Sequence, residues 1–185
     1  MKEIIFVLDY ETFKDNIMKT AKYASKYVDK IWFRVKNVDA KESYILASTL
    51  RNCLPDTFLI ISERPDIAFL AGFDGVHLNT SSSLLVKLKK RFPKLTFGFS
   101  AHNIQEIIDY DFDYFTLSPV FYTNKGYPVS PLGCMDVSNI KKDIYALGGI
   151  NSKNIFQLKG KGYKGIAGIS FFKEISEIKK IMSCF

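Results

Sequence analysis

Cysteine is scarce in this chain, and its few residues have no regular spacing. Cys53, Cys134 and Cys184 lie far apart in the sequence. Disulfide frameworks need more cysteines, and zinc sites need ligands at short, regular intervals, so neither is expected here. Three unpaired thiols are typical of a protein kept in a reducing compartment.

Long apolar runs and clusters of one charge are also missing. The run Ile4–Leu8 is five residues long and ends at Asp9, too short for a signal peptide or a membrane span. The net charge is +7, but the lysines are scattered and form no basic run. We therefore expect a cytoplasmic protein with no membrane or nucleic-acid partner, whose modest positive field helps to recruit a small phosphorylated substrate. Homo-oligomerisation stays open.

Short apolar runs alternate with helix-like segments along the whole chain. The expected strands are Ile4–Asp9, Lys30–Lys36, Thr57–Ser62, Gly75–Asn79, Thr96–Ser100, Tyr114–Val120, Tyr145–Ile150 and Gly165–Ser170. The expected helices are Phe13–Tyr27, Ser43–Leu54, Pro65–Ala71, Leu84–Phe92, Ile104–Asp109, Asn154–Lys159 and Glu174–Met182. One long stretch, Phe121–Asp136, is irregular and rich in Pro, Gly and Asn.

Eight such units with near-continuous apolar strands predict an α/β fold, a single (β/α)8 TIM-barrel domain over residues 1–185. The fold typically takes ~250 residues, so helices or loops must be trimmed. An open doubly wound sheet is the alternative. No GxGxxG motif follows the first strand, which weighs against it.

Glycines follow the last two strands, at the start of helix-like segments. Gly148 and Gly149 end one strand, and Ile169 and Ser170 end the next. Backbone N–H groups can approach an anion closely where no Cβ intervenes, and a helix N-terminus favours negative charge. Two such turns on the last two units are the usual phosphate site of a (β/α)8 barrel. We therefore predict a phosphate cradle.

Polar and cationic side chains lie at the C-terminal ends of the other strands, where this fold places its active site. Arg34 and Lys36 alternate on one side of their strand. Two cations there need water or an anionic partner, and we expect an anion. The other polar or turn residues at these ends are Ser62, Glu63, Arg64, His77, Asn79, Ser100, His102, Ser118 and Pro119.

Six segments together resemble the thiamine phosphate synthase/TenI family. They occur in the family order and cover nearly the whole chain. The segments are FRVK (33–36), SERPDIAFLAGFDGVHL (62–78), GFSAHN (98–103), SPVFYT (118–123), ALGGI (146–150) and GIAGIS (165–170). The resemblance implies the same barrel fold, so it agrees with the strand pattern.

The resemblance also implies roles for individual residues. A synthase joins hydroxymethylpyrimidine diphosphate to thiazole phosphate and releases pyrophosphate with Mg²⁺. Arg34 and Lys36 would hold pyrophosphate and pyrimidine, and Ser100 would contact pyrophosphate. The cradle of Gly148, Gly149, Ile169 and Ser170 would hold the thiazole phosphate. His77, Ser118 and Thr123 complete the expected substrate-binding set.

The chain departs from the synthase pattern on the metal side. Ser62-Glu63 stands where synthases carry Asn-Asp, and Asn79-Thr80-Ser81-Ser82 replaces a Gly-Gln-x-Asp turn. Thr123-Asn124-Lys125-Gly126 only partly matches a Thr-x-Thr-Lys loop. Glu63 is left as a weak metal ligand, since one carboxylate binds Mg²⁺ less well than two. The residues expected to bind the diphosphate and the metal are therefore partly replaced, whereas those expected to bind the thiazole phosphate are all present.

This asymmetry resembles the TenI branch, whose thiazole tautomerases move a proton and need no metal. That activity is the favoured expectation. TenI enzymes use a histidine after strand six, where this chain has Ser118-Pro119, so His102 is the expected acid/base, with Lys36 or Glu63 as further proton carriers. The alternatives are a synthase with an altered metal site, which would need Mg²⁺, and a non-catalytic ligand-binding or regulatory homologue. Residues 121–136 form either a lid or an ordered loop.

Overall fold

The computed structural model describes residues 1–79, 85–123 and 129–185. Eight parallel strands close into a barrel in sequence order, with β1 hydrogen-bonded to both β2 and β8. The strands are β1 (Glu3–Asp9), β2 (Lys30–Arg34), β3 (Phe58–Ser62), β4 (Gly75–Leu78), β5 (Thr96–Ala101), β6 (Tyr114–Leu117), β7 (Ile144–Leu147) and β8 (Gly165–Gly168). The predicted (β/α)8 barrel is confirmed.

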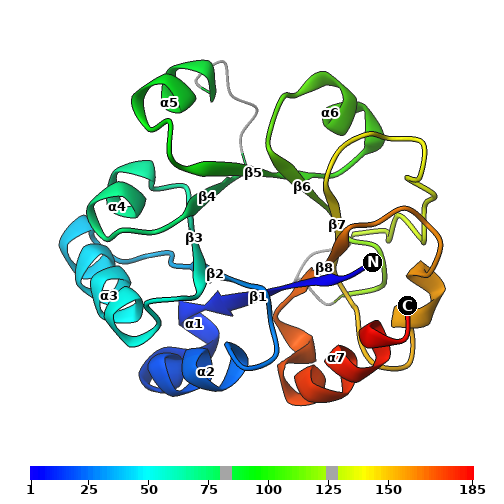
Figure 1. Ribbon diagram of the computed structural model, residues 1–185, viewed down its shortest axis with the longest axis horizontal. Coiled ribbons are helices and arrows are strands. Elements are labelled where there is room, and N and C mark those ends of the chain that lie inside the picture. The colour runs from blue at the N-terminus through cyan, green and yellow to red at the C-terminus, as the bar shows by residue number, and fades with distance from the viewer. Residues whose placement is uncertain (80–84, 124–128) are drawn as a thin grey trace.

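Helices form a ring outside the strands (Figure 1). They are α1 (Tyr10–Phe13), α2 (Ile17–Ala24), α3 (Ala40–Cys53), α4 (Pro65–Leu70), α5 (Leu85–Arg91), α6 (Ile104–Asp109) and α7 (Ile175–Ser183). Three single 3-10 turns accompany them: η1 (Lys14–Asn16), η2 (Ile155–Leu158) and η3 (Ser170–Glu174). Several of these helices are only one or two turns long, as the short chain requires.

The first expected helix, Phe13–Tyr27, is broken into three pieces. Helix α1 begins earlier, at Tyr10, because the Asp9 carboxylate accepts a hydrogen bond from Thr12 N at 3.1 Å and caps the first turn. The chain leaves the helix at Lys14, where φ is 35°, and resumes as α2 after η1. The prediction of one continuous helix was therefore wrong.

The second half of the barrel is more irregular than predicted. The expected helix Asn154–Lys159 is only the 3-10 turn η2, and strand β6 ends at Leu117 instead of Val120. No helix occurs between β6 and β7 in the parts that the structure describes, residues 118–123 and 129–143. Those parts of the predicted irregular stretch are indeed without regular structure.

Alternate strand residues divide the apolar core into two regions. Ile5 and Val7 of β1 point into the barrel, where they pack with Trp32, Tyr114 and Tyr145. The residues between them face outward and pack beneath the helices, as in any strand buried on both faces. On β1 these outward residues are Ile4, Phe6 and Leu8. The strand pattern therefore assigns inward residues to the site and outward residues to the scaffold.

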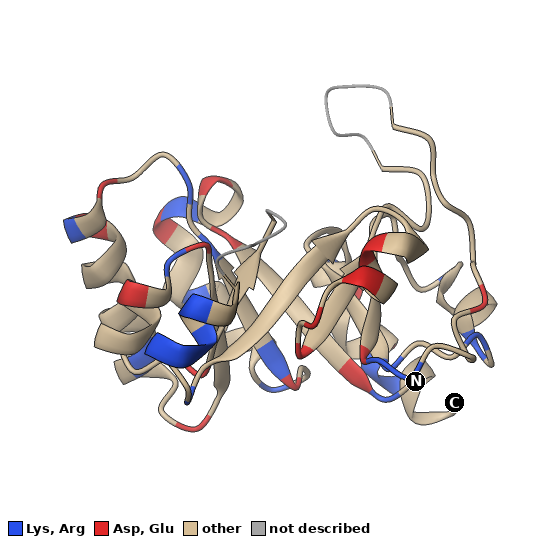
Figure 2. Ribbon diagram, turned by 90° about the horizontal axis from the view of Figure 1, so that it is seen from above, with Lys and Arg blue, Asp and Glu red and all other residues tan. Residues whose placement is uncertain are grey.

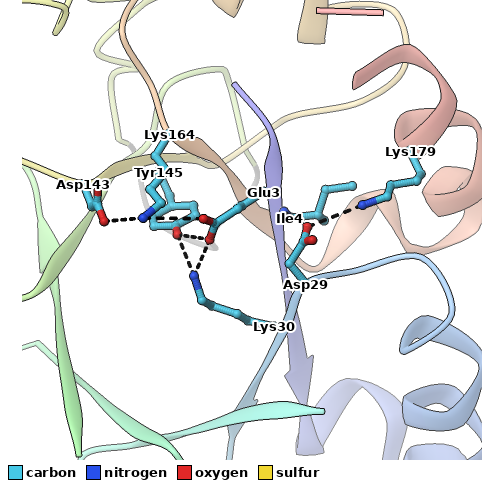
Figure 3. Close-up of polar contacts among 8 residues, drawn as sticks. All are labelled: Glu3, Ile4, Asp29, Lys30, Asp143, Tyr145, Lys164 and Lys179. Atoms are coloured by element: carbon cyan, nitrogen blue, oxygen red, sulfur yellow. Dashed lines mark hydrogen bonds and ion pairs between the residues drawn. The ribbon is translucent and has the colours of Figure 1, made fainter. Parts of the chain in front are cut away.

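A charged network closes the N-terminal end of the barrel (Figure 3). Lys30 donates to the Glu3 carboxylate and to Tyr145 Oη, and Tyr145 donates to Glu3 Oε2 at 2.6 Å. Lys164 forms ion pairs with Glu3 and Asp143. Burial alone would raise the pKa of Glu3, but the hydrogen bonds from Lys30 and Tyr145 and the charges of Lys30 and Lys164 together outweigh it and lower that pKa.

Charged residues of both signs are interspersed over the helices and loops in Figure 2, and both termini lie at one end of the barrel. Within residues 1–79, 85–123 and 129–185, no helix has the length and apolar character needed to cross a membrane.

Candidate functional site

A cavity of about 500 Å³ lies among the C-terminal ends of the strands. This volume suits a small-molecule ligand. All the residues to which the sequence gave a catalytic, phosphate-binding or substrate-binding role lie on its wall, whereas Arg64 and Pro119, also expected at the strand ends, do not. The residues with such a role are Arg34, Lys36, Glu63, His77, Ser100, His102, Ser118, Thr123, Gly148, Gly149, Ile169 and Ser170. The barrel thus brings the expected residues together, whereas the role of each remains a proposal.

The two glycines after β7 adopt backbone conformations that other residues rarely take. Gly148 has φ of 102° and Gly149 has φ of 67°. A Cβ on Gly148 would lie 2.8 Å from the Pro119 side chain, and one on Gly149 would lie 2.3 Å from Tyr122 O. Both positions therefore require glycine for backbone geometry and for space. Asn154 Nδ2 donates to Gly149 O at 2.9 Å and supports the turn.

The second half of the expected cradle lies at the end of β8. Ile169 is half-buried and Ser170 is exposed, and Ser170 begins η3, which continues directly into α7. The first N–H groups of a helical segment have no partner within the segment and can receive an anion. The glycine turn and this helical start lie on the wall of one cavity.

Arg34 is the last residue of β2, and a neighbouring carboxylate holds its side chain. Its guanidinium forms an ion pair with Asp9, which is only 5% exposed. The other carboxylate oxygen of Asp9 accepts from Thr12 N and from Thr12 Oγ1 at 2.6 Å. The Asp9 carboxylate therefore both holds the side chain of Arg34 and caps the first turn of α1.

Lys36 and Glu63 lie beyond their strands and are both exposed. Lys36 follows the last residue of β2 by two positions, so it lies in the loop and not in the strand that was predicted to reach it. Glu63 has φ of 61°, and its Oε1 accepts a hydrogen bond from Asn79 N at 2.7 Å. Glu63 therefore connects the ends of β3 and β4 at the edge of the cavity.

His77 lies deeper in the barrel than these residues, on the inner part of the cavity wall. It is 1% exposed, and its ring packs against Trp32 with centroids 3.9 Å apart and an interplanar angle of 35°. Its two nitrogens contact Tyr114 Oη at 3.0 Å and Ser100 Oγ at 2.9 Å. Burial lowers the pKa of His77 to about 3, so the imidazole is neutral at pH 7.

His102, the expected acid/base, makes two contacts that hold its loop. Its backbone N donates to Glu106 Oε2 at 2.7 Å, and its Nδ1 lies 3.0 Å from Ser118 O. A carbonyl oxygen can only accept, so Nδ1 carries the proton and Nε2 is the basic nitrogen of the neutral ring. His102 therefore holds its loop through Nδ1, and Nε2 stays available for proton transfer.

Carboxylate ligands for a metal are few. Glu63 is the one acidic residue on the cavity wall among the described residues, and these residues contain no group of three or more potential metal ligands. Mg²⁺ in phosphate sites commonly takes one or two carboxylates and completes its shell with substrate oxygens and water. A single Glu63 fits that minimum. Thr80 to Ser82 and Asn124 to Gly126, which carry the other departures from the synthase pattern, lie outside the described residues.

The profile of a protein family described as thiamine monophosphate synthase matches residues 4–172. The chain belongs to that family. It is 33% identical over 178 residues to an Aquifex aeolicus protein named "Putative thiamine-phosphate synthase 2", covering 91% of this chain and 96% of that one. It is 28% identical over 159 residues to the thiamine-phosphate synthase of Pyrococcus furiosus, covering 81% and 77% of the two chains. The predicted resemblance to a family of thiamine-pathway enzymes is confirmed.

Solved structures agree on the fold. The thiamine phosphate pyrophosphorylase of Pyrococcus furiosus superposes with a TM-score of 0.84 at 24% identity, covering 98% of this chain and 95% of the other. More distant barrels also superpose, among them an N-(5′-phosphoribosyl)anthranilate isomerase with a TM-score of 0.71 at 13% identity. At such identities the likeness describes the fold alone.

Three residues near the cavity escaped the sequence analysis: Asp9, Trp32 and Tyr114. Asp9 was assigned only as the end of a strand, although an Asp at that position followed by Thr12 is an N-cap signal. Trp32 and Tyr114 carried no signal, because an aromatic residue inside an apolar run is indistinguishable from ordinary core. Their inward direction follows from the register of the closed barrel.

Proposed function

We propose that this protein is a thiamine-phosphate synthase, which joins hydroxymethylpyrimidine diphosphate to thiazole phosphate and releases pyrophosphate. The proposal is supported by the names of these relatives, "Putative thiamine-phosphate synthase 2" and thiamine-phosphate synthase. These relatives favour the synthase over the tautomerase activity that the eroded metal residues had suggested.

One observation about the cavity carries the proposal. A single cavity joins a glycine and helix-start cradle on β7 and β8 to a cationic side on β2, with Arg34 and Lys36. A reaction between a phosphate ester and a diphosphate ester needs two anion sites that open into one space. A tautomerase with a single phosphate on its substrate would need the cradle alone.

The residues have separate tasks in this proposal. The cradle of Gly148, Gly149 and Ser170 binds the thiazole phosphate and orients the ring nitrogen. Arg34 and Lys36 stabilise the negative charge that develops on the leaving pyrophosphate. The bond between the pyrimidine methylene and the diphosphate oxygen breaks, and its electron pair leaves with pyrophosphate. The lone pair of the thiazole nitrogen then forms the new carbon–nitrogen bond.

The apolar lining between the two anion sites excludes water from the reacting carbon. Val7, Trp32, Leu147 and Ala167 contribute this surface from four strands. Water would otherwise compete with the thiazole nitrogen for the electron-poor methylene group. An indole face such as that of Trp32 also provides a flat contact for an aromatic pyrimidine.

Mg²⁺ fits this site as a partner of the diphosphate. Glu63 would hold it together with substrate oxygens, and the ion would neutralise the leaving group. Arg34 forms an ion pair with Asp9, which neutralises part of its charge. Arg34 and Lys36 alone would therefore not neutralise a diphosphate, and a cation bound with the substrate would supply further positive charge.

Thiazole tautomerase activity is the second candidate, because one observation favours it. Proton transfer needs no metal, and Glu63 is the single carboxylate among the described wall residues. His102, with Nε2 as its basic nitrogen, would then move the proton. The Lys36 amine and the Glu63 carboxylate remain the further proton carriers expected from the sequence.

A synthase assay tests the proposal. Purified protein is mixed with both substrates and MgCl₂, and thiamine phosphate is detected as its fluorescent oxidation product. The matched control is Ser170→Glu, because a carboxylate at the exposed start of η3 repels the thiazole phosphate without disturbing the core. We expect metal-dependent product from the unaltered protein and at least a hundredfold less from the variant.

Two other results would contradict the synthase proposal, and a third would contradict the assigned cradle. Absence of product, together with metal-independent proton exchange on the thiazole ring, would assign tautomerase activity. Absence of both, with thiazole phosphate still bound, would assign a non-catalytic binder. Equal product from Ser170→Glu would contradict the cradle itself.

A further inference from the structure

The buried imidazole of His77 has a proton arrangement that can be worked out from its neighbours. Both ring nitrogens contact hydroxyl groups, and the ring lies against Trp32 and is 1% exposed. A neutral imidazole has one donor and one acceptor nitrogen. Which nitrogen carries the proton therefore decides the direction of every hydrogen bond in the cluster.

Tyr114 determines that direction. Its ring crosses the barrel beside Gly98, where a Cβ would lie 2.0 Å from Tyr114 Cζ, so the ring has little freedom to move. Tyr114 is 5% exposed, and its hydroxyl has His77 Nδ1, at 3.0 Å, as its hydrogen-bond partner among the described residues. A buried phenol without an acceptor for its proton is costly. The Tyr114 hydroxyl therefore donates to Nδ1.

The proton of His77 must then lie on Nε2. Nε2 faces Ser100 Oγ at 2.9 Å, so the imidazole donates and the serine oxygen accepts. Thr116 Oγ1 is also buried and lies 3.4 Å from the same nitrogen, a longer and weaker contact than those of Tyr114 Oη at 3.0 Å and Ser100 Oγ at 2.9 Å, so the two shorter contacts set the direction. With its oxygen engaged as acceptor, Ser100 keeps its own proton to donate elsewhere.

Ser100 is half-buried and lies on the cavity wall. We propose that Tyr114 and His77 are positioning residues, which turn the Ser100 hydroxyl into a hydrogen-bond donor toward an anionic oxygen in the cavity. The chain of donors runs from Tyr114 through His77 to Ser100. The identification of this anionic oxygen with the diphosphate of the substrate rests on the proposed synthase function. The proton positions on Tyr114, His77 and Ser100 do not depend on that function.

Nitrogen NMR of the histidine rings tests the proton positions directly. The chain has two histidines, and the spectrum of His102→Gln assigns the signals of His77. We expect a protonated Nε2 and an unprotonated, hydrogen-bonded Nδ1 near pH 7. In Tyr114→Phe, the Nδ1 signal should move to the position of a nitrogen without a hydrogen bond. A protonated Nδ1 in the unaltered protein would overturn the proposal.

Pyrophosphate binding tests the consequence for the cavity. Without the Tyr114 hydroxyl, the His77 proton is no longer held on Nε2, and Ser100 can turn its proton inward to the ring. Ser100→Ala should weaken pyrophosphate binding in the presence of MgCl₂ about tenfold, the scale of a hydrogen bond to a charged group, and Tyr114→Phe should lose part of that affinity. Thiazole phosphate affinity should be unchanged in both variants.

Tyr145→Phe is the matched control, because it removes another hydroxyl from the barrel interior. That hydroxyl contacts Lys30 and Glu3 at the opposite end of the barrel, so pyrophosphate affinity should be retained. Equal loss in Tyr114→Phe and Tyr145→Phe would overturn the proposal, because it would indicate a general loosening of the core. Unchanged pyrophosphate affinity in Ser100→Ala would overturn it too.

If the synthase proposal is wrong, the assay and the binding experiments give a different combination of results. The unaltered protein would then form no thiamine phosphate, while the histidine signals and the pyrophosphate titrations would still report on Tyr114, His77 and Ser100.

Discussion

Gly149 is a position that no larger residue can occupy without moving the loop after β6. Its φ of 67° would strain an L-residue, and a Cβ would lie 2.3 Å from Tyr122 O and 2.9 Å from Phe121 C. Since the same turn forms half of the cradle, a shift of the loop also shifts the phosphate site. A single methyl group can therefore test both the packing and the function of the turn.

We predict that Gly149→Ala weakens thiazole phosphate binding at least tenfold. The matched control is Gly160→Ala, because Gly160 has φ of 74° but no atom within 4 Å of the place that a Cβ would occupy. That control should lose roughly 1–2 kcal/mol of stability from backbone strain alone and bind normally. Calorimetric titration with thiazole phosphate distinguishes the two variants, and equal affinities would contradict the assigned cradle.

Single residues also show which parts of the site the sequence alone can predict. Gly148, Gly149 and Ser170 were found because their chemistry and their position after a strand point to the same function. Tyr114 was not found, because its importance lies in a contact with His77 that comes from a different strand. Such contacts depend on register, which an apolar run does not reveal by itself.

At the scale of elements, the connection from β6 to β7 has no helix in its described parts, so other contacts must hold it. Lys142 reaches back to the end of α6, where Nζ donates to Ile107 O at 2.7 Å, to Tyr110 O at 2.6 Å and to Ile108 O at 3.3 Å. The last carbonyls of a helix lack partners within it, and a cation there is favourable. Lys142 therefore connects the segment before β7 to the end of α6.

We predict that Lys142→Met lowers the free energy of unfolding by about 1–2 kcal/mol, since several carbonyls lose a charged donor. Lys141→Met removes a neighbouring exposed lysine and should change stability by less than about 0.5 kcal/mol. Urea unfolding monitored by tryptophan fluorescence measures both. Equal stabilities of the two variants would contradict this role of Lys142, and the Michaelis constants should not change in either.

The strands could be predicted more fully than the helices, for a physical reason. A strand buried on both faces appears as a continuous apolar run, and all eight were located close to their observed bounds. Helix α1 and the turn η2 were misjudged, because their limits depend on the Asp9 cap and on local backbone angles at Lys14 and Asn154. A few side-chain contacts decide such short elements.

At the scale of the whole molecule, the buried His77 connects stability to pH. Burial lowers its pKa from 6.5 to about 3, so between these values the unfolded chain binds a proton that the folded chain does not. Stability therefore falls as pH drops from 6.5 toward 3. The contribution of one such group has a slope of up to about 1.4 kcal/mol per pH unit.

We predict that His77→Gln flattens this part of the stability profile, since glutamine does not titrate and its amide can both donate and accept. His102→Gln removes the other, exposed histidine and is the matched comparison. Urea unfolding at pH 7.0, 6.0, 5.0 and 4.0 gives the slopes. A slope in His77→Gln as steep as in the unaltered protein would mean that His77 does not cause the acid sensitivity.

The barrel as a whole separates stability from chemistry. The network of Glu3, Lys30 and Tyr145 closes one end, and the cavity with its two anion sites opens at the other. Conservative changes at the closed end should therefore alter unfolding more than binding, as the Tyr145→Phe control assumes.

The most direct test is a crystal structure of the protein with thiazole phosphate, pyrophosphate and Mg²⁺. The account predicts the thiazole phosphate at Gly148, Gly149 and Ser170, and the pyrophosphate at Arg34, Lys36 and Ser100, both in the one cavity. A thiazole phosphate bound elsewhere, or a pyrophosphate that occupies the glycine cradle when both ligands are present, would contradict it.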